Sequence, residues 1–441
     1  MRLCVVGLGR LGLPWALVAD AAGHEVSGLD VDGARVETIN RRAIDTREPE
    51  VAELLEDPGC NLSATTDPAQ ALAGAEISVI TVSTPSRDDG SFGLDAVLAA
   101  VETIGAQAPL LAPRHVVVLK STVSPGATDG PVREALTAAA ERASRGTQSA
   151  PPGLVHVPEF HAIGSIVHDI THPHVVIVGG DDGWALSRAQ ELHDSLAAGD
   201  VQVARLDAAG AELAKLASNS FRTLKIAFSN SLAELCDAYG SDPQAVCAAV
   251  GADPHVGRGY LGPGMPYGGP CYPRDNPALS AAAALVDLPA PLPAAIEIAN
   301  ERRFQELEEA LVLAAAAPGT AEPIGVLGIA FKQGVSELEG SSALALARRL
   351  RDGGHEVFVH DPLVAPAPTS GLRATPSVAA LLDACAVVLL ATPDPYLVAE
   401  LRVQLDGRER PPVIVDPWGA LSSAERKGAA RYQLPSHDAA G

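Results

Sequence analysis

The chain has 441 residues, which exceeds the usual size of one hydrophobic core and predicts two or three domains. Hydrophobic residues make up 47% of it and charged residues 20%, as is typical of a well-packed globular protein. Its net charge of -22 argues against nucleic acid and anionic membranes as partners, since both are negatively charged.

The first part of the chain alternates short apolar strands with helical segments. A helix is predicted over 13–23 and a loop over 142–153. The predicted strands lie at residues 2–8, 25–30, 76–82, 115–122 and 175–180. Strands that alternate with helices are typical of a parallel, doubly wound α/β sheet. We therefore expect a Rossmann-like domain over residues 1–204.

From about residue 205 the pattern becomes helical. Residues 211–240 form a long amphipathic repeat that stops at Gly240, longer than the usual helix of a globular protein. Helices of this length often join two domains or pack against a second copy of the chain. We therefore expect residues 205–300 to be a central helical region that carries catalytic residues and forms a homodimer.

A second set of apolar strands follows a linker predicted at residues 314–323. These predicted strands lie at residues 324–331, 355–361, 386–392 and 412–416. They repeat the pattern of the first part and predict a second Rossmann-like domain over 301–441, with a frayed tail at 432–441. The expected fold class is α/β, with two doubly wound domains joined by a long-helix region.

Cysteine usage and hydropathy restrict the compartment. The six cysteines show neither CxxC nor Cys/His metal spacing, so no metal site is predicted and reduced thiols are favoured over disulfides. Glycines interrupt the apolar N-terminus, which is predicted to be a strand and not a signal peptide. No run of about 18 apolar residues exists, so no membrane span is expected. These features predict a cytoplasmic protein.

The first predicted turn carries a dinucleotide fingerprint. Gly7, Gly9 and Gly12 fit G-x-G-x-x-G between a strand and a helix. Asp30 closes the second strand, where a carboxylate binds the ribose diol of NAD and repels the 2'-phosphate of NADP. Arg35 leaves NADP open as a second cofactor. The fingerprint predicts an NAD-dependent enzyme.

Two further motifs bear on the chemistry. Lys215 and Asn219 lie four residues apart on one helix face and could stabilise a developing alkoxide. Cys271 lies in a constrained turn, YGGPCYPRDN, that is expected to be neither helix nor strand. A thiolate can form a thiohemiacetal and then a thioester, which oxidation of an aldehyde to an acid requires. Arg274 would favour the thiolate, and Asp275 could orient the hydrolytic water.

Taken in chain order, these motifs resemble the UDP-glucose/GDP-mannose dehydrogenase family over almost the whole length. The motifs that carry the resemblance are VVGLGRLGLP, TVSTPSRDDGSFG, LKSTVSPGAT, VPEFHAIGSIVHDITHP, KLASNSFRTLKIAFSNSLAELC, YGGPCYPRDN, GVLGIAFK and VHDP. Such enzymes oxidise C6 of a nucleotide-linked sugar to a carboxylate with two NAD. The commonest reaction the resemblance implies is UDP-glucose to UDP-glucuronate. TDP-glucose, GDP-mannose and UDP-N-acetylhexosamines remain alternatives, in polysaccharide or antibiotic sugar pathways.

The resemblance also implies residue roles, which fall into three sets. The implied catalytic residues are the nucleophile Cys271, the oxyanion pair Lys215 and Asn219, and the water-positioning Asp275, Glu159 and Thr122. The implied NAD contacts are Gly7, Gly9, Arg10, Leu11, Gly12, Asp30, Arg35, Thr84, Thr122 and Arg274. The implied nucleotide-sugar contacts are Glu159, Phe160, His161, Ala162, Ile163, Lys215, Asn219, His255, Tyr260, Leu261, Gly262, Gly264, Gly268 and Lys332, with His255 at a position where the family commonly has an arginine that enters the neighbouring subunit's site.

The sequence departs from the family pattern at several binding positions. Ile163 stands where an acidic residue is often found, Pro270 where serine precedes the nucleophile, and Glu339 where an arginine commonly contacts the cofactor. These departures leave the sugar and the base open. Two other hypotheses also stay open at this stage. One is a two-electron dehydrogenase of a small hydroxy acid, and the other is a non-catalytic dinucleotide-binding protein.

Overall fold

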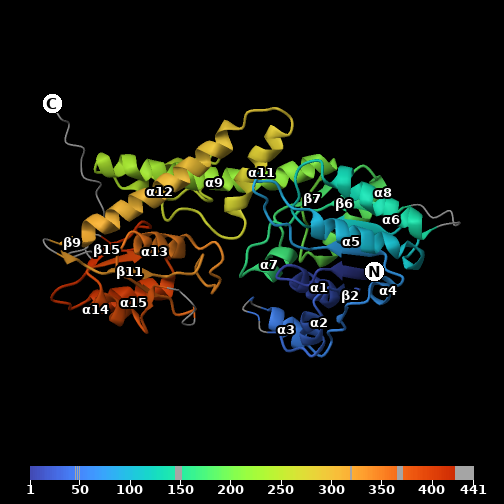
Figure 1. Ribbon diagram of the computed structural model, residues 1–441, viewed down its shortest axis with the longest axis horizontal. Helices are drawn as coiled ribbons and strands as arrows, with labels where there is room; N and C mark the ends of the chain where they lie inside the picture. Colours follow the sequence, from blue (N-terminus) through green and yellow to red (C-terminus); the bar gives the residue numbers. More distant parts are fainter. Residues whose placement is uncertain are drawn as a thin grey trace. The chain divides into compact units, whose positions relative to one another are not determined.

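The computed structural model describes residues 1–422 apart from 45, 47, 49, 145–150, 318–319 and 365–370. The tail expected at 432–441 lies outside the described residues, as do parts of the loop at 142–153 and of the linker at 314–323. The chain divides into two compact units (Figure 1). The first unit comprises Met1–Ser218 and Ala278–Pro289, and the second comprises Asn219–Pro277 and the chain from Ala290 onward.

The first unit is built on an eight-stranded sheet in the order β3-β2-β1-β4-β5-β6-β7-β8. The strands are β1 (Arg2–Val6), β2 (Glu25–Leu29), β3 (Ser63–Thr65), β4 (Ile77–Ile80), β5 (Val116–Leu119), β6 (Gly153–His156), β7 (Val176–Gly179) and β8 (Val203–Leu206). All neighbours pair in parallel except β6 and β7, which meet antiparallel through His156 and Gly179. The sequence order reverses beside β1, so β1 and β4 form the switch point where such sheets bind ligands.

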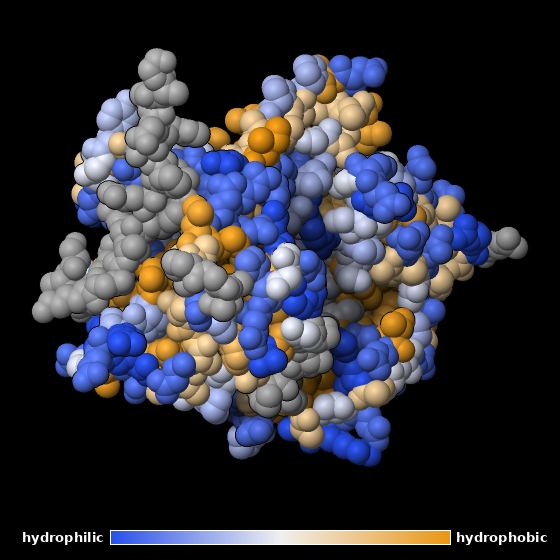
Figure 2. Space-filling model, turned by 60° about the vertical axis from the view of Figure 1, so that its left-hand side comes forward, coloured by the Kyte–Doolittle hydropathy of each residue, from blue (hydrophilic) through white to orange (hydrophobic). Residues whose placement is uncertain are grey.

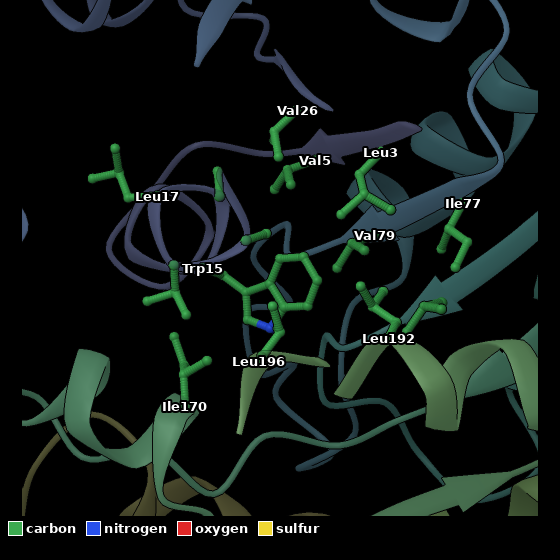
Figure 3. Close-up of a cluster of buried hydrophobic side chains, with 14 of the residues drawn as sticks. Leu3, Val5, Trp15, Leu17, Val26, Ile77, Val79, Ile170, Leu192 and Leu196 are labelled. Atoms are coloured by element: carbon green, nitrogen blue, oxygen red, sulfur yellow. The ribbon is translucent and has the colours of Figure 1, made fainter. Parts of the chain in front are cut away.

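Helices and buried strands explain why this sheet is stable. The helices of the unit are α1 (Gly12–Ala21), α2 (Gly33–Asn40), α3 (Val51–Glu56), α4 (Pro68–Leu72), α5 (Asp95–Ala106), α6 (Arg133–Ala143), α7 (Ile166–Thr171) and α8 (Gly183–Leu196). Separate hydrophobic clusters cover the two faces of the sheet. In one of them Trp15 of α1 lies among side chains of β1, β4 and α8 (Figure 3). Burial on both faces accounts for the continuous apolar run of β5, VVVL, and for the apolar residues of β4, ISVI, in which Ser78 is also buried.

The predicted long helix is α9, Ala208–Ala238, with 31 residues. The boundary between the two units falls inside it, after Ser218. Three further helices follow: α10 (Pro243–Gly251), α11 (Tyr272–Ala284) and α12 (Pro291–Ala315). The expectation that the whole YGGPCYPRDN segment is a turn is wrong for its second half, because α11 begins at Tyr272. Pro273 is tolerated there, since the first turn of a helix needs no intrahelical N–H.

The second unit contains a five-stranded parallel sheet in the order β13-β12-β11-β14-β15. Its strands are β11 (Ile324–Leu327), β12 (Val357–His360), β13 (Arg373–Ala374), β14 (Val387–Leu390) and β15 (Val413–Val415), with helices α13 (Ser342–Asp352), α14 (Val378–Ala384) and α15 (Pro395–Leu405). A short pair, β9 (Ala316–Ala317) and β10 (Thr320–Ala321), precedes it. Two hydrophobic clusters again flank the sheet, so the predicted second doubly wound domain is confirmed.

The surface mixes hydrophilic and hydrophobic residues, as the face drawn in Figure 2 shows. On α9, three large apolar side chains recur every seven residues and are about half exposed: Phe221 (60%), Phe228 (52%) and Leu235 (57%). Among the described residues, none of the helices combines the length and the hydropathy that a membrane crossing requires.

Candidate active site

The glycine turn after β1 has the geometry of a dinucleotide cradle. Gly7 has φ +91°, a conformation that favours glycine. A Cβ on Gly12 would overlap the carbonyl oxygen of Gly7. A Cβ on Gly9 would meet only Nη1 of Arg35, at 3.4 Å, so the turn is open outside Gly9. The first and third glycines therefore close the turn, and the second leaves its backbone open to a pyrophosphate.

Asp30 and Arg35 both hold this turn. Asp30 accepts hydrogen bonds from the backbone N–H of Leu8 over 2.7 Å and of Asp32 over 2.9 Å. Arg35 donates to the carbonyl of Leu8 over 3.3 Å. Both predicted cofactor residues thus lie at the glycine turn, where a ribose diol would find a carboxylate. The other predicted cofactor positions of this unit lie in loops: Arg10 and Leu11 before α1, Thr84 after β4 and Thr122 after β5.

Glu159 lies in a buried group of basic side chains just after β6. One carboxylate oxygen pairs with Nζ of Lys120, and the other is 2.6 Å from Nδ1 of His161. Burial raises the pKa of Glu159, but His161 and Lys120 outweigh it and hold this pKa below its usual range. Glu159 is therefore a fixed, ionised carboxylate. Sequence reasoning identified Glu159 and His161 but missed Lys120, although it lies in the LKST motif.

Two buried histidines surround this group. Burial, with the nearby charge of Lys120 as a smaller cause, lowers the pKa of His156 and of His193 to about 3. Nδ1 of His193 bonds to the carbonyl of Ala189 over 2.7 Å. Both imidazoles are therefore neutral at physiological pH.

Phe160 links this group to α9. Nζ of Lys215, which is buried, lies 5.1 Å from the centre of the Phe160 ring. Such cation–π contacts keep an ammonium group in place without neutralising it. Of the other predicted substrate residues in this unit, Ala162 is exposed and Ile163 is partly buried in the same loop.

Cys271 belongs to the second unit and directly precedes α11. It is exposed, and its carbonyl accepts hydrogen bonds from the N–H groups of Arg274 and Asp275 over 3.0 and 3.2 Å. The amino end of a helix carries partial positive charge, which stabilises an anion such as a thiolate. Four other cysteines, Cys4, Cys236, Cys247 and Cys385, are buried, as expected of structural thiols.

Behind Cys271 lies a buried polar pair. Nδ2 of Asn219 donates to Oδ2 of Asp275 over 2.6 Å, and both residues are less than 5% exposed. The next residue, Asn276, donates to Glu297 over 2.9 Å and to Tyr267 over 3.2 Å. These bonds fix the first turn of α11, and with it the backbone that carries the thiol. Lys215 and Asn219 lie one turn apart on α9, as predicted.

Residues 260–268 form a loop that is held on both sides. The backbone N–H of Gly264 donates to Asn230 over 2.9 Å, and its carbonyl accepts from Arg303 over 2.9 Å. A Cβ on Gly264 would overlap the ring of Trp418, and one on Gly268 would overlap the carbonyl oxygen of Gly340. Leu261 and Gly262 are partly buried in this loop. The predicted substrate glycines therefore also have a packing role.

Lys332 lies at the switch point of the second sheet, beside a pocket of 390 Å³. The pocket is lined by residues that follow β11, β12 and β14, among them Asp361, Thr392 and Asp394. Asp361 accepts from the backbone N–H groups of Ile329 and Ala330, both over 2.9 Å. Open α/β sheets bind ligands at this position, which makes the pocket a candidate nucleotide site.

His255 stands apart from these groups. Its side chain is 94% exposed, and Nδ1 bonds to Asp253 over 2.8 Å. Within the described part of the chain, no hydrogen bond or ion pair joins it to the loop at 260–268. The structure therefore leaves its expected role, which depends on a second subunit, as a prediction.

The fold and the glycine turn define an NAD-dependent dehydrogenase of the α/β class. The chain belongs to the UDP-glucose/GDP-mannose dehydrogenase family, whose NAD binding domain matches residues 1–197, whose central domain matches 209–302 and whose UDP binding domain matches 325–423. The resemblance noted in the sequence is therefore confirmed. The family's enzymes are NAD-dependent nucleotide-sugar 6-dehydrogenases.

Individual relatives cover most of the chain. It is 30% identical to a GDP-mannose 6-dehydrogenase of Pseudomonas putida over 87% of both chains. It is 31% identical to a UDP-glucose 6-dehydrogenase of Haloferax volcanii, over 82% of this chain and 84% of that one. A UDP-glucose dehydrogenase structure from Pyrobaculum islandicum superposes with a TM-score of 0.85 at 30% identity, covering 96% of this chain and 95% of that chain. These relatives are all named as nucleotide-sugar dehydrogenases, but for different substrates.

Proposed function

We propose that the protein oxidises the C6 hydroxyl of a nucleotide sugar to a carboxylate in two NAD-dependent steps, through a thiohemiacetal and a thioester on Cys271. The observation that carries the proposal is the exposed thiol at the start of α11, with the buried Asn219–Asp275 pair behind it. An alcohol dehydrogenase that stops at the aldehyde has no use for such a thiol.

Each residue then has a stated task. The glycine turn would hold NAD, which would supply the hydride acceptor for the oxidations at C6, with one NAD consumed in each. Lys215 and Asn219 donate to the C6 oxygen and stabilise its negative charge. The thiolate of Cys271 adds to the aldehyde carbon, and loss of the second hydride leaves a thioester. Asp275 and Glu159 orient the water that cleaves the C–S bond, which yields the carboxylate and returns the thiol. Thr122 assists in positioning that water.

The substrate we favour is UDP-glucose, which would give UDP-glucuronate. Support comes from relatives named as UDP-glucose dehydrogenases in both the sequence and the structure comparison. GDP-mannose stays an alternative because a relative of similar identity is named for it. TDP-glucose differs from UDP-glucose in its nucleoside, and UDP-N-acetylhexosamines differ from it in the sugar, so both belong to the same test. Lys332 and the loop of Tyr260 to Gly268 would hold this ligand.

The test measures NADH formed per sugar consumed over a panel of UDP-, TDP- and GDP-sugars, with the product weighed by mass spectrometry. The proposal expects two NADH and a product 14 mass units above the substrate, since two hydrogens are replaced by one oxygen. Cys271→Ser should abolish acid formation. One NADH per sugar, or full turnover by Cys271→Ser, would instead support a two-electron hydroxyacid-type dehydrogenase. No NADH on any sugar would favour a non-catalytic protein.

We also propose a cytoplasmic homodimer that assembles through the central region, 205–300, between an NAD domain at 1–204 and a nucleotide-sugar domain at 301–441. The support is the half-exposed apolar row of Phe221, Phe228 and Leu235 on α9. Reduced thiols support the compartment, since no disulfide joins any of the six cysteines, all of which the structure describes. Sedimentation of the wild type and of Phe228→Glu tests the dimer, and an unchanged dimeric mass in the variant would contradict this interface.

A further inference from the structure

Arg222 lies one helical turn after Asn219 on α9, inside the second unit. Its Nη1 donates to Oδ1 of Asn219 over 3.3 Å. The other end of the same amide, Nδ2, donates to Oδ2 of Asp275 over 2.6 Å. Asn219 is therefore held between a guanidinium on its own helix and a carboxylate on α11.

The chemistry of these two neighbours determines which way the amide faces. A guanidinium has only donors, so it requires the oxygen of Asn219, and an ionised carboxylate has only acceptors, so it requires the nitrogen. With Oδ1 and one Nδ2 hydrogen engaged, the second Nδ2 hydrogen remains available. A donor is what an alkoxide or a tetrahedral oxyanion at C6 needs, whereas the flipped amide would present an oxygen that repels it.

Arg222 is itself positioned by two aromatic residues. Its guanidinium lies 5.3 Å from the centre of the Tyr260 ring, and its charge also acts on the hydroxyl of Tyr272. Burial and then a hydrogen bond to Tyr260 raise the pKa of Tyr272, while Arg222 opposes this rise. Within the described chain, no carboxylate forms an ion pair with Arg222. The neighbours of its guanidinium are therefore Asn219, Tyr260 and Tyr272, and Tyr272 directly follows Cys271.

We propose that Arg222 is a positioning residue for the oxidation at C6, acting by fixing the orientation of the Asn219 amide. The inference rests on the proposed function, because it assumes that Asn219 donates a hydrogen bond to the oxyanion. It goes beyond that function in assigning a catalytic effect to a side chain that itself need not touch the substrate.

The experiment is a double-mutant cycle on the full-length enzyme. Arg222→Ala should lower kcat about 10- to 100-fold, the effect of one charge-assisted hydrogen bond, with KM within about threefold of the wild type. In an Asn219→Ala background the same change should have almost no further effect on kcat. Added guanidinium at millimolar concentration should partly restore the kcat of Arg222→Ala and leave the kcat of the double variant unchanged.

Lys225→Met is the matched control. Lys225 lies on the same helix, but its Nζ binds the carbonyls of Gly257 and Gly259 over 3.1 and 3.0 Å, away from Asn219. Its effect on kcat should therefore be the same with and without Asn219. An Arg222→Ala effect that persists in full in the Asn219→Ala background would overturn the proposal, as would wild-type kcat in Arg222→Ala.

Arg222→Lys keeps a hydrogen-bond donor and a positive charge. It replaces Arg222→Ala in the experiment if that variant does not fold. It should retain more kcat than Arg222→Ala or Arg222→Met, and equal losses in all three would overturn the proposal. The NADH-to-sugar ratio of the wild type is recorded in the same assays. A ratio of one rejects the four-electron reaction, whatever the effect of the Arg222 variants. If the effects of Arg222→Ala and Asn219→Ala on kcat are additive, only the proposed role of Arg222 is rejected.

Discussion

Asn219 of α9 and Asp275 of α11 share a 2.6 Å hydrogen bond in a buried position. This bond ties the long central helix to the helix that begins behind Cys271. A group proposed to stabilise the oxyanion and a group proposed to orient the hydrolytic water therefore depend on each other's position. Removing either side chain would leave the other buried without its partner, at a cost of about 1–3 kcal/mol.

Asp275→Asn separates this structural role from the chemical one. An asparagine side chain keeps an oxygen that can accept the bond from Asn219, so the melting temperature should change little. It cannot serve as a base, and loss of a general base typically lowers the rate about 100-fold or more. We expect slow thioester hydrolysis, seen as a rapid burst of NADH followed by slow turnover. Intact-protein mass spectrometry should show a covalent adduct that is absent from the Cys271→Ser, Asp275→Asn double variant. A uniformly slow reaction with no burst would contradict the assignment.

Gly12→Ala tests the cradle predicted from the fingerprint. The added Cβ would overlap the carbonyl oxygen of Gly7, which is backbone and cannot turn aside. We expect NAD affinity to fall about tenfold or more, because relief of an overlap of this kind costs about 1–3 kcal/mol and shifts the turn. Gly33→Ala is the matched control, since a Cβ at the start of α2 has nothing within 4 Å. Titration calorimetry with NAD compares the two. Equal affinities would show that the turn is not the cofactor site.

Much of this architecture follows from local sequence patterns. The glycine spacing, the alternation of strands and helices, and the length of α9 are short-range signals, and the structure agrees with each. The contacts around the candidate site are different, because they join residues distant in the chain. Nothing local predicts that Lys120 pairs with Glu159, or that Asn219 bonds to Asp275. The sequence does not single out Arg222, because a partly buried arginine on an amphipathic helix resembles an ordinary solvent-facing one. The prolines around Cys271 predict a loop, whereas α11 begins at Tyr272 with Pro273 in its first turn.

The buried imidazole of His193 should make the free energy of unfolding depend on pH. Burial lowers its pKa in the folded protein to about 3, from a value near 6.5 in the unfolded chain. The unfolded chain therefore binds the proton first as the pH falls. The stabilisation is fully present above pH ~6.5 and is lost progressively toward pH ~3. Between pH 7 and pH 5 this one residue should lower the free energy of unfolding by about 2 kcal/mol.

The measurement for His193 is urea unfolding followed by tryptophan fluorescence at the two pH values, since Trp15 lies 6.2 Å from the His193 ring. A glutamine side chain does not titrate in this range. The free energy of unfolding of His193→Gln should therefore fall by about 2 kcal/mol less between pH 7 and pH 5 than that of the wild type. His174→Gln provides a control, because the His174 side chain is exposed. An identical pH dependence in wild type and His193→Gln would show that this imidazole is not buried in its neutral form.

Lys332 provides the last prediction, on the second sheet. Its position beside the pocket at the switch point suits an anionic group such as a diphosphate, while the reacting C6 is assigned to other residues. Lys332→Met should therefore raise KM for the nucleotide sugar about 10-fold or more, the range for a hydrogen bond to a charged group, and leave kcat within about threefold. Arg373→Met is the control, since Arg373 is an exposed cation of β13 paired with Glu356. Initial rates over a range of sugar concentrations, with product inhibition by the free nucleoside diphosphate, separate the two effects. If Lys332→Met lowers kcat and leaves KM unchanged, Lys332 acts in the chemical step and the pocket is not the anchor for the nucleotide.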